Sequence, residues 1–119
     1  MYHRFGEDSL PSTSVRLEQF DAHLAELTSG KYQVMALPEI LDRLRRGEAL
    51  PEHAVAITID DAALSVYHEA WPRLKAAGLP VTVFVSSKPL DLGLPSYMSW
   101  AQLREMAADP LVTIGNHGH

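Results

Sequence analysis

The chain has 119 residues, 46% of them hydrophobic, which suits a single domain and is short for a complete α/β barrel of about 250 residues. Fifteen acidic residues against ten basic ones give a net charge of −5, and no basic stripe is present to bind nucleic acid. The absence of cysteine excludes disulfides and cysteine–zinc sites, and no apolar run approaches the roughly 18 residues of a membrane-spanning helix.

The first half of the chain predicts a strand, a loop, a helix, a strand and a second helix. The opening MYHRF has the pattern of a strand end, and the turn-rich GEDSLPSTS follows it. Leucine and phenylalanine recur at helical spacing after Ser14, and Gly30 stands where a helix-ending glycine belongs. YQVMAL is a short strand candidate, and the next helix is expected from Pro38 to Gly47.

The second half predicts three strands with helices between them. HAVAITI and VTVFV are apolar, β-branched runs that suit strands covered on both faces. A helix from about Ala62 to Gly78 should be kinked or split at Pro72. A long loop, SSKPLDLGLPSYM, precedes a helix that opens on the capping-box pair Ser99 and Gln102, and LVTI is the last strand.

This alternation predicts an α/β fold with a parallel sheet and right-handed crossovers. Sites in such folds lie at the carboxyl ends of the strands, so the residues after each strand are the candidates. These are Tyr2, His3 and Arg4 after the first strand, Asp60 and Asp61 after HAVAITI, Ser86 and Ser87 after VTVFV, and Gly115 to His119 after LVTI.

The Asp60–Asp61 pair is the first candidate for chemistry. Two adjacent carboxylates at a buried strand end are hard to keep charged without compensation, and a divalent metal would neutralise one and leave the other as a base. Carboxylate and imidazole together suit Zn²⁺, Co²⁺, Ni²⁺ or Fe²⁺. The alternative is structural: Asp61 caps the following helix and Asp60 is solvated.

The histidines and tryptophans carry weaker signals. His117 and His119 are either ligands or part of an unstructured terminus, whereas His23, His53 and His68 lie away from the predicted site face and suit ordinary surface or core roles. The remaining aromatic candidates, Trp71 and Trp100, are expected in the core rather than stacked on a ligand.

Four segments, MYHRFGED, AITIDDA, VTVFVS and SWAQLREMAADPLVTIGNHGH, resemble the polysaccharide deacetylases, the NodB homology group of carbohydrate esterase family four. The resemblance implies an irregular (β/α) barrel, here incomplete, with residues 1–119 forming a partial domain that ends within the second metal-binding motif.

The resemblance also implies roles for individual residues. TIDDA matches the family's Thr-Phe-Asp-Asp-Gly motif, with Ile59 for Phe and Ala62 for Gly, which makes Asp60 the catalytic base and Asp61 a metal ligand. His117 matches the first histidine of the His-Ser/Thr-x-x-His motif, whose second histidine would fall beyond His119. We therefore hold His119 and His3 as weaker site candidates, and the later family motifs are not present in this chain.

The function implied by the resemblance is metal-dependent removal of N-acetyl or O-acetyl groups from an acetylated glycan, with Zn²⁺ expected and Co²⁺ or Ni²⁺ as alternatives. With two of three ligands in place, the chain alone is expected to be inactive or barely active. A shortened, non-catalytic module that binds a glycan or a partner is the alternative, with self-association through its open sheet edge. Phosphoryl transfer on the Asp pair, with Ser86, Ser87 or Lys88 as partners, is a third and weaker reading. The sequence leaves the cellular location open.

Overall fold

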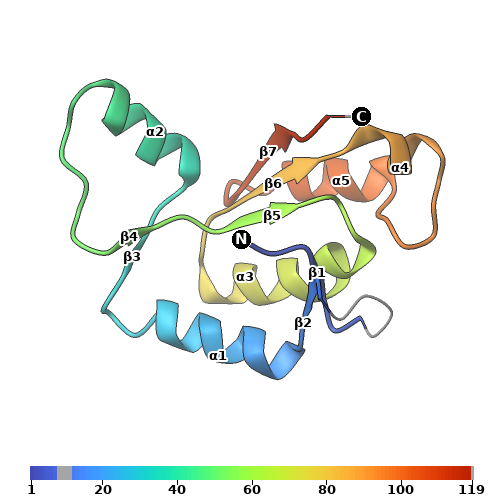
Figure 1. The fold of residues 1–119 in the computed structure, drawn as a ribbon, viewed down its shortest axis with the longest axis horizontal. Coiled ribbons are helices and arrows are strands. Elements are labelled where there is room, and N and C mark those ends of the chain that lie inside the picture. The colour runs from blue at the N-terminus through green and yellow to red at the C-terminus, as the bar shows by residue number, and fades with distance from the viewer. Residues whose placement is uncertain (8–11, 119) are drawn as a thin grey trace.

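The computed structural model describes residues 1–7 and 12–118, and Figure 1 shows its arrangement. The strands are β1 (Arg4–Phe5), β2 (Ser14–Val15), β3 (Gln33–Val34), β4 (Ala54–Val55), β5 (Thr58–Asp60), β6 (Val81–Val85) and β7 (Val112–Asn116). The helices are α1 (Leu17–Leu27), α2 (Leu37–Arg45), the π-helical turn η1 (Val66–Ala70), α3 (Trp71–Ala77), α4 (Ser87–Asp91) and α5 (Trp100–Ala107).

The centre of the fold is a parallel sheet in the order β5-β6-β7. A further parallel bridge between Tyr2 and Ile59 brings the start of the chain beside β5. The short pairs β1-β2 and β3-β4 are also parallel and form separate sheets, and the central sheet does not close into a barrel. The predicted α/β class and incomplete barrel are therefore confirmed.

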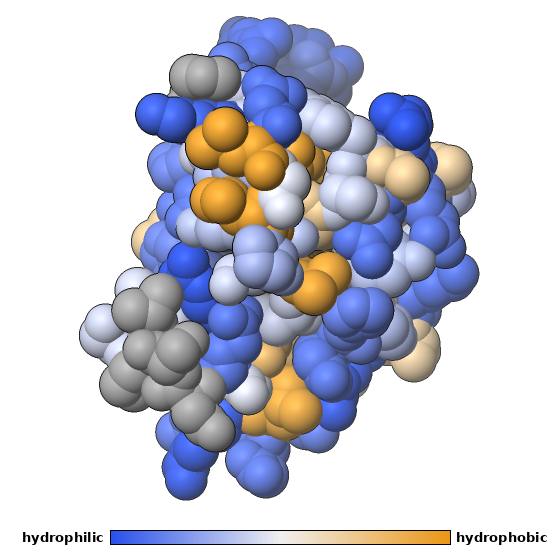
Figure 2. All heavy atoms as spheres, turned by 90° about the vertical axis from the view of Figure 1, so that its right-hand side faces the viewer, coloured by the Kyte–Doolittle hydropathy of each residue, from blue (hydrophilic) through white to orange (hydrophobic). Residues whose placement is uncertain are grey.

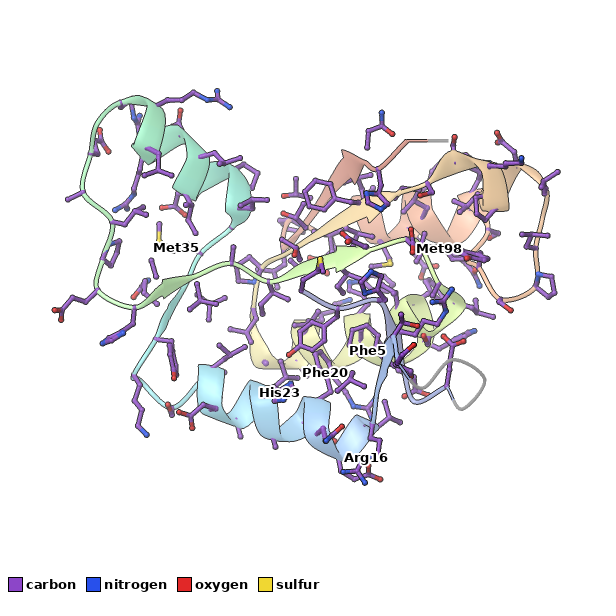
Figure 3. The ribbon with its side chains drawn as sticks, in the orientation of Figure 1. Phe5, Arg16, Phe20, His23, Met35 and Met98 are labelled. Carbon is purple, nitrogen blue, oxygen red and sulfur yellow. The ribbon has the colours of Figure 1, made fainter. Side chains whose placement is uncertain are left out.

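The two faces of the central sheet differ in their burial. Because side chains alternate along each strand, residues paired across β5, β6 and β7 point to the same face. Val81, Val83, Val85, Val112 and Ile59 belong to one buried cluster with the residues that α1, α3 and α5 contribute. Phe5 of β1 and Phe20 of α1 lie within this cluster and point toward one another, with ring centroids 4.6 Å apart (Figure 3). Burial of these side chains provides the main driving force for this half of the fold.

The opposite face of the sheet lines an open cleft. Thr82, Phe84, Thr113 and Gly115 form one wall and α2 forms the other, enclosing about 640 Å³. α2 contributes no buried residue and stands apart from the other helices (Figure 1). The predicted burial of both strand faces holds for most of VTVFV, in which only Phe84 is partly exposed. It does not hold for HAVAITI, in which only Ile57 and Ile59 are buried.

Several predicted boundaries are also corrected. HAVAITI is not one strand, because β4 pairs with β3 while β5 pairs with β6. YQVMAL contributes only the two residues of β3, since Pro38 already lies in the first turn of α2. The loop predicted over SSKPLDLGLPSYM contains α4, and the loop GEDSLPSTS contains part of β2, with residues 8–11 outside the described chain.

The predicted signals that start, divide or end a helix are confirmed in two places. The helix that precedes β6 is divided into η1 and α3, with Pro72 in the first turn of α3, and Gly78 ends it in the left-handed conformation. Ser99 and Gln102 form the expected capping box, in which the Gln102 N–H donates to Ser99 Oγ over 3.1 Å.

Of the two tryptophans, one departs from expectation. Trp71 packs against the core and donates from Nε1 to Asp109 Oδ2 over 2.9 Å. Trp100 is exposed because it is the first residue of α5, where its ring lies beyond the buried stripe and donates to Asp91 Oδ1.

Candidate active site

Two consecutive carboxylates lie at the carboxyl end of β5 and face different partners. Asp60 is the last residue of β5, and its side chain is 15% exposed. Asp61 adopts a left-handed conformation with φ of 59°, which is uncommon for a residue other than glycine and is found most often for Asp and Asn. A left-handed residue held at a strand end is a feature that clusters at functional sites.

Asp61 meets residues from both neighbouring strands. Ser86, directly after β6, donates from Oγ to Asp61 Oδ1 over 3.3 Å. His117, directly after β7, places Nε2 3.8 Å from the same oxygen. The ends of three adjacent parallel strands therefore converge on one carboxylate. This partner set differs from the helix-capping role that the sequence left open for Asp61.

The position of His117 is fixed by the backbone around it. Its N–H donates to the carbonyl of Val85 over 2.9 Å, which continues the β6-β7 ladder by one residue. The Gly118 N–H donates to Asn116 Oδ1 over 2.8 Å, and the Gly118 carbonyl accepts from the N–H of Ser87 over 3.1 Å. This Asx turn holds the histidine at the strand end, with its side chain 47% exposed.

Asp60 faces the start of the chain. His3 places Nε2 3.6 Å from Asp60 Oδ2, and its side chain is 28% exposed. The backbone brings the two together, because the Asp60 N–H donates to the Tyr2 carbonyl over 2.8 Å. His3, a weaker candidate from sequence, is thus the nearest imidazole partner of the proposed base.

Two further residues help to build this edge. From sequence, Ser86 is a partner only in the phosphoryl-transfer reading, and Asn116 is only one of the residues that follow LVTI. Ser86 follows β6 as Asp61 follows β5, so its place at a strand end is the signal that identifies it. Asn116 precedes His117 and Gly118, and an Asn two residues before a glycine is typical of an Asx turn. The other sequence candidate, His119, lies outside the described residues.

The remaining histidines lie elsewhere, as expected. His23 accepts or donates a 2.8 Å hydrogen bond with the Tyr2 hydroxyl, and His53 and His68 are exposed beside Tyr32 and Tyr67. Over residues 1–7 and 12–118, no three or more His, Cys, Asp or Glu side chains are grouped closely enough to hold a metal ion. The four candidate side chains therefore form two separate pairs, Asp61–His117 and Asp60–His3.

One family of known proteins matches the part of the chain that contains these strands and acidic residues. The sequence profile described as polysaccharide deacetylase matches residues 47–119, which is more than half of the chain. The chain belongs to the polysaccharide deacetylase family. The match contains β5, β6 and β7 together with Asp60, Asp61 and His117.

Curated relatives agree with this assignment of family. A putative polysaccharide deacetylase, YxkH of Bacillus subtilis (strain 168), is 31% identical over 107 residues, covering 90% of this chain and 37% of that protein. The poly-beta-1,6-N-acetyl-D-glucosamine N-deacetylase of Escherichia coli (strain K12) is 31% identical over 117 residues, covering 87% of this chain and 17% of that protein.

Solved structures agree on the fold. IcaB from Ammonifex degensii superimposes with a TM-score of 0.87 at 31% identity, over 98% of this chain and 50% of that one. The Streptococcus pyogenes deacetylase PplD in complex with acetate gives a TM-score of 0.83 at 24% identity, over 98% and 54%. The chain therefore spans about half the length of these structural relatives, and less than half of the curated ones.

Proposed function

We propose that the Asp60–Asp61 site serves metal-dependent removal of an acetyl group from an N-acetylated glycan. The observation that supports this most directly is the convergence of three strand ends on Asp61, with the second carboxylate, Asp60, free to act beside it. The family assignment gives the reaction class, since deacetylase relatives act on acetylated carbohydrate. O-acetyl groups remain a second substrate of the same chemistry.

Asp61 and His117 are the residues that would hold the metal. A carboxylate and an imidazole form a donor set that suits Zn²⁺, with Co²⁺ or Ni²⁺ as alternatives. Their ligand atoms lie 3.8 Å apart, and two ligands of a tetrahedral zinc ion are separated by about 3.4 Å, so a small side-chain movement suffices. The metal would supply Lewis-acid polarisation of the acetamide carbonyl.

Asp60 is the proposed general base. Its carboxylate accepts a proton from the attacking water while the water oxygen forms a bond to the acetyl carbon. The carbon–nitrogen bond then breaks, the nitrogen takes up a proton, and the products are acetate and a free amino sugar. His3 lies beside the Asp60 carboxylate and would stabilise its charge when the imidazole is protonated, or receive a proton from it when neutral.

The described residues supply two metal ligands where a catalytic zinc site uses three. We propose that the remaining ligand, and the acid that protonates the leaving nitrogen, come from outside residues 1–118. His119 is a weaker candidate for the ligand. The isolated chain is accordingly expected to release acetate slowly or not at all.

A chimeric enzyme tests the proposal. Residues 1–118 would replace the matching segment of the Escherichia coli poly-beta-1,6-N-acetyl-D-glucosamine N-deacetylase, and acetate release from poly-β-1,6-N-acetylglucosamine would be measured with Zn²⁺. Asp60→Asn in the chimera should lower the rate by about 10²-fold or more, since the base is lost while the fold is retained. Asp42→Asn, at an exposed carboxylate of α2 that pairs with Arg46, is the matched control and should not change the rate.

Two outcomes would contradict the proposal: a folded chimera that releases no acetate, or an Asp60→Asn chimera as active as its parent. The 119-residue chain should be assayed in parallel. Robust turnover by that chain, abolished by Asp60→Asn, would refute the claim that its metal site is incomplete.

The non-catalytic alternative also has a structural observation in its favour. β7 is an edge of the central sheet, and the sheet face beside it opens on the cleft against α2. An unpaired parallel edge can recruit another chain. In this reading the fold binds a glycan or a partner, and the Asp60→Asn substitution has no effect on that binding. Within the described part of the chain, no helix is long and apolar enough to cross a membrane.

A further inference from the structure

Arg4, the residue after His3, is the centre of a polar network that the deacetylation chemistry above does not use. Its Nη2 donates to the Tyr97 hydroxyl and its Nη1 donates to Thr13 Oγ1, each over 3.2 Å. Its Nε lies 4.0 Å from Glu7 Oε1. The Arg4 side chain is 11% exposed, so these partners fix the guanidinium instead of solvent.

The network is anchored in the core through Glu7. Ser65 donates from Oγ to Glu7 Oε2 over 2.5 Å and accepts a 3.0 Å hydrogen bond from the Phe5 N–H. Ser65 and Phe5 are both buried. The position of Arg4, and hence of the Tyr97 hydroxyl, is therefore set by the folded core before any ligand binds.

Tyr97 lies beside the proposed catalytic pair. Its segment runs antiparallel to the residues that follow Asp61, through a bridge between Ala63 and Tyr97. The Met98 N–H donates to the Ala62 carbonyl over 2.9 Å, which ties this segment to the end of β5. Tyr97 is thus held near the Asp60–Asp61 turn through its backbone, and its hydroxyl is held by Arg4.

The hydroxyl hydrogen of Tyr97 is available to donate a hydrogen bond to a ligand. A guanidinium has no acceptor, so in the contact with Arg4 the phenol oxygen can only accept. No other residue of the described chain lies within hydrogen-bond distance of that oxygen, and its O–H hydrogen has no protein acceptor. Tyr97 is partly exposed, and a tyrosine combines an apolar ring face with a polar tip, as a sugar ring requires.

A cavity of about 270 Å³ lies beside Arg4. It is bordered by His3 and by the hydroxyl-bearing residues Ser12, Thr13 and Ser14, and Tyr97 is not among the residues that line it. The loop between α4 and α5 exposes Leu92 and Leu94. Figure 2 views the molecule from the right-hand side of Figure 1 and shows apolar patches on a largely polar surface.

We propose that Tyr97 is a substrate-binding residue, which donates its hydroxyl hydrogen to an oxygen of the N-acetylated sugar bound beside Asp60 and His3. Arg4 is its positioning residue, because it holds the phenol oxygen as an acceptor and directs the hydroxyl hydrogen outward. The inference rests on the proposed deacetylase function for the substrate class, an N-acetylhexosamine oligomer. A ligand that lacks an acceptor at this point would leave the Tyr97 donor unpaired and bind less well.

Binding of a pentamer of N-acetylglucosamine to the 119-residue protein tests the proposal by nuclear magnetic resonance titration. Tyr97→Phe keeps the ring and removes the donor, and should weaken binding about three- to tenfold. Tyr32→Phe, directly before β3 and in a different cavity, is the matched control and should leave the dissociation constant unchanged. Arg4→Met should also weaken binding, and Arg4→Lys, which retains a donor to the phenol oxygen, should restore part of it.

The inference is overturned if the pentamer does not bind, or if Tyr97→Phe binds it as tightly as the unmodified chain while both unfold at the same temperature. Its failure is distinguishable from that of the proposed function. A chimera that releases acetate independently of Tyr97 would refute the subsite and retain the function, whereas Tyr97-dependent binding without acetate release would do the reverse.

Discussion

Gly115 provides a quantitative test of how β6 and β7 fit together beneath the candidate site. It pairs with Phe84 across the two strands, and the Phe84 ring lies against it. A Cβ added at Gly115 would lie 2.7 Å from Cδ1 and 2.8 Å from Cε1 of that ring. Gly115→Ala therefore forces either the ring or the strand to move.

Two opposing free-energy contributions decide how much Gly115→Ala changes the stability of the fold. Forcing an extra methyl group into packed surroundings costs about 1–3 kcal/mol, and the lower half applies because Phe84 lines the open cleft and can turn partly into it. Replacing glycine by alanine returns about 0.4–1 kcal/mol through the unfolded state, since Gly115 is not among the residues with positive φ. The expected net destabilisation is about 1 kcal/mol.

Urea unfolding measures this directly. With a slope of about 1–3 kcal/mol/M, the midpoint should fall by roughly 0.3–1 M. Phe84→Leu removes the ring, so in that background Gly115→Ala should become neutral or slightly stabilising, and the two substitutions should couple by about 1 kcal/mol. Equal effects of Gly115→Ala in both backgrounds, or an increase in stability of the unmodified chain, would refute this packing argument.

Three further outcomes are expected. The first concerns Asp109, whose carboxylate accepts from the Leu111 N–H and the Trp71 Nε1–H, and these hydrogen bonds hold its pKa below the usual value. The ionised carboxylate therefore stabilises the folded state above pH 3.8, and this stabilisation is lost as the pH falls through the lower pKa of the folded state. Asp109→Asn should thus cost about 0.5–1 kcal/mol at pH 7, since solvent screens this weakly buried carboxylate. Urea midpoints should show the difference shrinking in acid, and a pH-independent difference would contradict the assignment. Phe20→Ala should cost about 3–5 kcal/mol by the same assay because its ring is fully buried, and a loss below 1 kcal/mol would show that the Phe5–Phe20 contact is not part of the stable core. If the β7 edge recruits a second chain, light scattering should give a mass that rises with concentration and amide hydrogen exchange in β7 should slow with it, whereas a monomer at all concentrations would exclude self-association.

Much of the fold is predictable because it depends on local patterns. The apolar run of β6 and the capping box at Ser99 specify their elements within a few residues, and the alternation of strands with helices predicts the parallel sheet. The split of HAVAITI is not predictable in this way, since it arises from pairing with two different partners, β3 and β6. α4 is not predictable from the sequence for a different reason. Its opening residues, Ser-Lys-Pro, have a composition that is typical of a turn and therefore predicts a loop.

The candidate site shows the same division. A carboxylate after β5 and an imidazole after β7 are expected at one edge of a parallel sheet, and the structure places Asp61 and His117 there. The distance between Asp60 and His3 depends on the bridge between Tyr2 and Ile59, which joins segments more than fifty residues apart and has no local signal. The roles of these four residues remain proposals.

Metal binding by the 119-residue protein tests the central claim most directly. In a Zn²⁺ titration followed by competition with a chromophoric chelator and by the His117 imidazole resonances, one ion should bind, and Asp61→Asn should weaken it at least about tenfold. Asp42→Asn should bind Zn²⁺ as the unmodified chain does, because Asp42 is an exposed partner of Arg46 on α2. Equal affinities of the Asp61→Asn variant and the unmodified chain, with no change at His117, would contradict a metal site at these strand ends.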